Sequence, residues 1–154
     1  MNKRIDKIKK LRQVVLNQIA ELSIEQLNKI PANFQNNIVW NLSHMIAAQQ
    51  TICYVRAGLP IAVEEKFFGR FISGTKPDGV LNANEIDLIK ETFTNSLDQL
   101  QADYDRNIFH NYTPSPGIQK AYGITLENID EALEYVLYHE GLHAGYISAL
   151  KHIV

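Results

Sequence analysis

The sequence is poor in cysteine, in charge of one sign and in long apolar runs. Its single cysteine, Cys53, excludes an intrachain disulfide and a site built from several thiolates, and it is typical of a reducing compartment. Basic and acidic residues number 15 and 17, so the chain lacks the positive excess that nucleic acid attracts. No apolar run approaches the roughly 20 residues of a membrane helix, and no signal core follows the charged start. We therefore expect a cytoplasmic protein that binds neither nucleic acid nor membranes.

Helical periodicity is the dominant pattern in the rest of the chain. A length of 154 residues and a hydrophobic content of 45% suit one core, so we expect a single domain over 1–154. Apolar residues recur at helical spacing over 2–26, over 36–57, after Asn82, and from beyond Thr125 almost to the end. Because no stretch alternates as a strand does, the fold class predicted is all-α, a four-helix bundle.

Two connections are unusually long for a bundle. The segment 58–81 greatly exceeds the roughly 2–8 residues usual between antiparallel neighbours. It can cross the whole bundle, so the helices on either side of it can run parallel. A second long connection covers 107–125, and both are expected to border a site. The helix at 36–57 is apolar on nearly every face, which places it in the core or at the interface of a homodimer.

Three histidines are candidate metal ligands. His139 and His143 are four positions apart, which puts them on one face of a helix, where two imidazoles can share an ion. Their stripe also holds Ala132, Tyr135, Tyr146 and Leu150, and it is therefore expected to face inward. Burying two unpaired imidazoles is costly, and a metal would satisfy both. From spacing alone, His44 is either the third ligand or a packed, hydrogen-bonded core histidine.

Glu140 completes the string H-E-x-x-H with these two histidines, a metalloprotease pattern in which it would act as general base. The metzincin extension fails, because Tyr146 and Ala149 stand where its glycine and histidine belong. A hydrolase that uses Glu140 is thus the weaker alternative. The other reading of Glu140 is a solvent-exposed helix residue.

Other reactive or charged residues are not assigned to the site. Cys53 points to nearly the opposite face of its helix from His44 and is interpreted as a packed small hydrophobe. The remaining histidines and the cations near the loops are expected to face solvent; they are His110, His152, Arg56, Arg70 and Lys76.

The order of these motifs resembles a known family. The segment Trp40-Asn41-Leu42-Ser43-His44, the long crossover and His139-x-x-x-His143 together resemble the DinB-like (YfiT-like) superfamily over essentially the whole chain. The resemblance implies an up-down-down-up bundle and a metal site, often zinc or nickel, with His44, His139 and His143 as ligands. It also implies a small-molecule substrate, because members include thiol transferases that use low-molecular-weight thiols and proteins described as hydrolases.

The expected function is therefore a metal-dependent transferase or hydrolase that activates water or a thiol. The alternative is a non-catalytic protein whose metal only joins two helices, and both readings predict the same ligands. Since each imidazole must be deprotonated to bind, acidification to about pH 5 is expected to release the metal.

Overall fold

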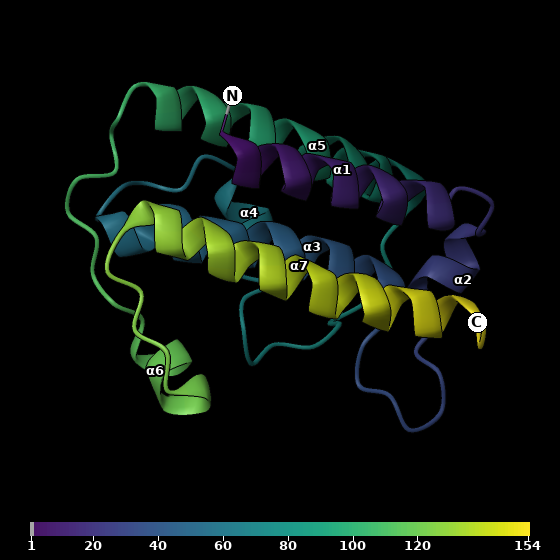
Figure 1. The fold of residues 1–154 in the computed structure, drawn as a ribbon. Coiled ribbons are helices and arrows are strands. Elements are labelled where there is room, and N and C mark those ends of the chain that lie inside the picture. The colour runs from purple at the N-terminus through teal and green to yellow at the C-terminus, as the bar shows by residue number, and fades with distance from the viewer. Residues whose placement is uncertain (1) are drawn as a thin grey trace.

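The structure is a computed structural model that describes residues 2–154, apart from the side chains of residues 66 and 67. Every regular element in this part of the chain is helical, which confirms the all-α fold class. In order, the elements are α1 (Lys3–Gln18), α2 (Ile24–Asn28), α3 (Ile38–Gln49), η1 (Gln50–Tyr54), η2 (Val55–Ala57), α4 (Glu65–Phe68), α5 (Ala83–Asp105), α6 (Pro116–Tyr122) and α7 (Ile129–Lys151). The four long helices α1, α3, α5 and α7 form the bundle (Figure 1). None of the helices in the described residues is long and apolar enough to span a membrane.

Side chains that join the long helices give their directions, because residue numbers rise together only between parallel partners. They rise together between α1 and α7 and between α3 and α5, as in Arg4–Glu134 with Arg12–Glu140 and Gln49–Ser96 with Tyr54–Asp103. They run oppositely between α1 and α5 and between α3 and α7, as in Asn2–Gln101 with Lys9–Asp98 and Asn41–His143 with His44–His139. This is an up-down-down-up order. The chain between α3 and α5 must therefore travel the length of the bundle.

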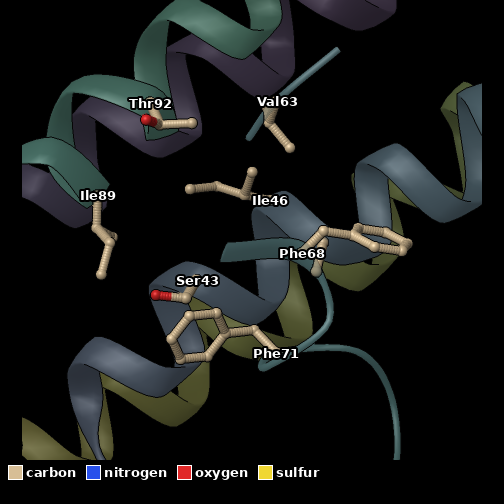
Figure 2. Close-up of a pocket in the computed structure, with 8 residues that line it drawn as sticks. Ser43, Ile46, Val63, Phe68, Phe71, Ile89 and Thr92 are labelled. Atoms are coloured by element: carbon tan, nitrogen blue, oxygen red, sulfur yellow. The ribbon is translucent and has the colours of Figure 1, made fainter. Parts of the chain in front are cut away.

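That crossover packs against α3. The side chains of Phe68 and Phe71 lie beside Ser43 and Ile46 of α3, and Figure 2 shows them around a small pocket that α5 closes from the other side. The pocket holds about 10 Å³, room for no more than one water, so it is a packing gap. The packing of Phe68 and Phe71 against α3 thereby holds the backbone of the crossover in place along that helix.

Helix α3 is covered within the chain. Eleven of its residues are buried, on all sides of the helix, by the crossover and the other long helices. The apolar circumference that suggested a homodimer is thus accounted for by one copy. Self-association stays a prediction that needs another surface.

Several boundaries differ from the sequence prediction. The first helix ends at Gln18, and α2 starts separately after a capping box between Ser23 and Gln26. The helix predicted to reach residue 57 leaves α geometry at Gln50 and continues as a π-helical turn and a 3-10 turn. Helix α5 begins directly after Asn82, as the periodicity predicts, and Asn82 forms a capping box with Glu85.

Candidate metal centre

His44, His139 and His143 meet between α3 and α7. One ring nitrogen of each lies within 4.8 Å of those of the other two, and among the described residues these three form a group that could hold a metal ion. The ring centroids are 4.4 Å apart for His139 and His143, and 4.8 Å and 5.2 Å apart for the pairs with His44. Of the two readings of His44, the structure favours the one in which it joins the other two.

The centre lies at the margin of the core. His44 is buried, whereas His139 and His143 are half-buried. The expectation that the whole α7 stripe faces inward is wrong at Tyr146, which is 43% exposed. His139 and His143 therefore lie on a part of α7 that is only half-buried, which gives a ligand access to them.

Two hydrogen bonds orient the rings. Nδ1 of His44 lies 2.7 Å from the carbonyl oxygen of Phe71, which can only accept, so Nδ1 carries the proton. Nδ1 of His143 lies 2.8 Å from Oδ1 of Asn41, whose amide nitrogen donates to the Asn37 carbonyl and so fixes Oδ1 toward the ring. In both histidines Nε2 keeps its lone pair for a metal, as is usual when a second partner holds the other nitrogen.

Aromatic rings pack against the ligands. The indole of Trp40 stacks on His44 with centroids 4.7 Å apart and planes within 7°. Tyr135 lies one turn before His139, with centroids 6.3 Å apart. These contacts restrict ring rotation, so the histidines are held in place by the protein itself.

Burial keeps the imidazoles neutral. It lowers the pKa of His139 to about 3, and the neighbouring His143 and His44 act in the same direction. Burial lowers the pKa of His143 to about 4, with a further contribution from His44. Burial also lowers the pKa of His44, against the opposing hydrogen bond to Phe71. At neutral pH all three rings are in the form that binds metal.

A cavity of about 620 Å³ opens beside the centre. Its walls come from α3, the crossover, α6 and α7, and α6 is the element that stands apart from the four long helices in Figure 1. The residues that line it are His44, Ala48, Thr51, Ile52, Phe68, Ile72, Ser73, Ser115, Gly117, Ile118, Ala121, Tyr122, Tyr135, His139, Leu142 and His143. Both long connections thus border the site, as the sequence predicts.

Glu140 is buried and pairs with Arg12 instead of facing solvent or the histidines. The side chain is fully buried, so the solvent-exposed reading is wrong. Both of its oxygens accept hydrogen bonds from Arg12, at 3.0 Å from Nε and 2.6 Å from Nη2. Arg12 also donates to the Phe93 carbonyl and to Ser96. A carboxylate held this way inside the bundle is poorly placed to act as a general base, and the geometry gives no support to that role.

The residues left outside the site are mostly where the sequence placed them. Cys53 is buried, and burial raises the pKa of its thiol to about 12, so it is an inert packed side chain. Those that face solvent are His110, His152 and Lys76. Arg70 pairs with Asp78 at the surface. Arg56 is only half-exposed and donates to the Pro114 carbonyl, so it anchors the loop that leads into α6.

Two groups that orient the ligands were not identified from the sequence. Asn41 lies three positions before His44 on the same helix face, a spacing that could have suggested a shared role. The Phe71 carbonyl carries no sequence signal, because any residue supplies a carbonyl and only the path of the crossover brings this one to His44.

Comparison with known proteins agrees with this arrangement. No curated protein matches the chain significantly. A family model described as the DinB superfamily matches residues 7–147, a range that includes all three histidines and both long connections. The chain therefore belongs to the DinB superfamily.

Proposed function

We propose that His44, His139 and His143 bind one divalent transition metal ion, zinc or nickel, and that the protein is an enzyme that uses it. The observation that carries the proposal is the convergence of three neutral imidazoles, two of them oriented by hydrogen bonds, beside a cavity of about 620 Å³. Imidazole suits these metals, and three protein ligands leave coordination positions for other groups.

In this proposal, residues of the chain orient the histidine rings and bind the substrate. Phe71 and Asn41 hold the protons of His44 and His143 at Nδ1, which leaves both Nε2 atoms free. The cavity admits a small molecule to the same place and shields it from water on the α3 and α6 sides. A bound metal would supply Lewis acidity, lowering the pKa of water or a thiol at the open positions. The reaction proposed is thus a thiol transfer or a hydrolysis.

The alternative is a structural metal that only ties α3 to α7. Structural sites are usually closed by a fourth protein ligand, and no such ligand joins the three histidines among the described residues. The large cavity beside the histidines also favours the enzyme. Hydrolysis that depends on Glu140 is the least favoured option, since Arg12 occupies both carboxylate oxygens.

Metal binding can be followed through Trp40, the only tryptophan, whose indole stacks on His44. We expect Ni²⁺ to quench its fluorescence with a stoichiometry of about one per chain, as three ligands from one chain imply. His44→Ala and His139→Ala should each weaken binding by at least about tenfold, since second-shell changes alone cost that much. His110→Ala and His152→Ala, at exposed positions, are the matched controls and should bind like the wild type.

Equal occupancy in the wild type, His44→Ala and His139→Ala, measured by elemental analysis after loading, would overturn the ligand assignment. The enzyme is tested by screening the zinc and nickel forms with thiol and ester substrates. Activity that appears only in a metal-loaded form and is lost in His139→Ala is expected. A protein that binds the metal but turns over nothing would favour the structural alternative.

A further inference from the structure

The described side chains that line the cavity beside the histidines include no ion pair and no lysine, arginine or carboxylate. Apart from the histidines, its polar side chains are hydroxyls, those of Thr51, Ser73, Ser115, Tyr122 and Tyr135. The rest of the surface is aliphatic or aromatic. A ligand inside it would find few partners for a charge.

Some of these hydroxyls already form hydrogen bonds within the protein. Thr51 donates to the Ala47 carbonyl at 2.9 Å within its own helix. Ser115 accepts from the backbone of Ile118 as the cap of α6. Burial raises the pKa of Tyr135 to about 12, so it offers a hydroxyl and no negative charge at neutral pH.

Arg12, Arg56 and Arg70 do not line the cavity. Arg12 is fully buried and paired with Glu140. Arg70 pairs with Asp78, and Arg56 donates to the Pro114 carbonyl. An anionic group placed in the cavity away from the histidines would thus lose part of its hydration without gaining an ion-pair partner among the described lining residues.

We propose that the substrate has an uncharged, largely apolar body and reaches the histidines through a single polar head group. This inference rests on the proposed function for the role of the head group, and on the cavity wall for the body. A volume of about 620 Å³ lies in the usual range for small-molecule pockets, roughly 300–1,000 Å³. Peptide-like thiols that carry several carboxylates do not match this wall, whereas aromatic or alkyl thiols and neutral esters do.

The test compares two probes with the same head group, benzyl alcohol and 4-(hydroxymethyl)benzoate, on the full chain without added metal at pH 7.5. Binding is followed by the backbone amide shifts of ¹⁵N-labelled protein. We expect saturable shifts in α6 and α7 with benzyl alcohol, and binding of the carboxylate probe at least about tenfold weaker, because its charge finds no partner. Equal or tighter binding of the carboxylate probe, or no saturable shift with either, would overturn the proposal.

Variants sharpen the comparison. Leu142→Lys on α7 and Ala121→Lys on α6 each add a cation at a partly exposed position of the cavity wall. Each should bring the affinity for the carboxylate probe up to or above that for benzyl alcohol. Val14→Lys adds the same charge on α1, which contributes no residue to the wall, and should keep the wild-type preference. An unchanged preference in both wall variants would contradict the proposal.

The two proposals can fail separately. The probe comparison is done without metal, so it does not depend on the ligand assignment. Addition of Zn²⁺ to the same sample should shift the amides around His139 and His143, and absence of that shift would count against the proposed function alone.

Discussion

Arg12 and Glu140 form an ion pair in which both side chains are 0% exposed. Removing one partner of such a pair leaves an uncompensated buried charge, which costs about 3–5 kcal/mol. We predict that Glu140→Gln and Arg12→Met each lower the free energy of unfolding by about that amount in urea titrations. The double variant Arg12→Met with Glu140→Leu should lose much less than the sum.

The same variants test the general-base reading. If Glu140 only holds the bundle together, Glu140→Gln should keep the wild-type Ni²⁺ affinity under conditions where it is folded. A fall in turnover by a factor of about 100 or more, measured under conditions where the variant is folded, would restore Glu140 as a general base.

The histidine pKa values predict how stability depends on pH without metal. The folded pKa of His139 is about 3 and that of His143 about 4, below the unfolded value of about 6.5. As pH falls below about 6.5, the unfolded chain takes up protons that the folded chain refuses, so the folded state loses stability. The loss is at most about 1.4 kcal/mol per pH unit per histidine, down to about pH 4.

Urea titrations between pH 7.5 and 4.5 measure this slope. His143→Gln should flatten it relative to the wild type, whereas His110→Gln, at an exposed position, should leave it unchanged. Parallel curves for the wild type and His143→Gln would show that His143 is not held neutral by the fold.

These values also move the pH at which metal is released. Release near pH 5 was expected from free imidazoles, but in the folded protein His139 and His143 are still neutral there. We predict that excess Zn²⁺ raises the melting temperature at pH 7.5 and still does so at pH 5, and that the increment fades near pH 4. Calorimetry with and without Zn²⁺ checks this, and loss of the increment already at pH 6 would be incompatible with it.

At the scale of elements, the backbone conformation of two glycines decides whether a change to alanine stabilises or destabilises the protein. Gly145 lies inside α7, and an added Cβ would meet nothing within 4 Å. Gly145→Ala should stabilise the protein by about 0.5–1 kcal/mol, which raises the melting temperature by roughly 1–4 °C. Gly123 ends α6 with φ 68°, so Gly123→Ala should destabilise it by about 1–2 kcal/mol. Shifts of the same sign in both, by scanning calorimetry, would contradict this reading.

Elements with strong local signals could be predicted, and those shaped by packing could not. Asn82 caps α5 together with Glu85, and Asp130 and Glu131 lie in the first turn of α7. These interactions act within one helical turn, so the sequence is enough to find both helix starts. The short helix α6 was missed although Ser115 with Pro116 and Gly123 mark its ends, because its few residues carry no apolar period. No local sequence pattern marks the π-helical turn at Gln50–Tyr54, so it could not be predicted.

At the scale of the whole molecule, association needs a surface other than α3. Tyr138, Leu142 and Tyr146 recur every four residues on α7 and are 51%, 46% and 43% exposed. If the chain forms the homodimer expected, this stripe is one apolar face available to it, and the dimer would then cover Leu142 at the cavity wall. Light scattering at micromolar concentration should give twice the monomer mass, and Tyr138→Glu should give the monomer. Val14→Glu on α1 is the control, and a monomeric wild type would remove the prediction.

The meeting of the three histidines could be predicted from the sequence, whereas their surroundings could not. His139 and His143 share a face by helix geometry alone, whereas the family resemblance was needed to add His44 to the predicted site. The buried place of Glu140 depends on the face of α7 that meets Arg12 of α1, and the role of Phe71 depends on where the crossover runs. Both follow from packing between segments that are distant in the chain.

The three histidines belong to segments separated by most of the chain, since Asn41, which lies on α3 with His44, bonds to His143 at a distance of 102 positions. During synthesis from the N-terminus, His44 has neither His139 nor His143 beside it until α7 has been made and has packed against α3. A site of this kind cannot take up its ion in a partly made chain, so ion capture would mark the completion of folding. Loading should therefore lag behind the formation of α1, α3 and α5 in a refolding experiment, and a chelator added early should leave the pace of helix formation unchanged.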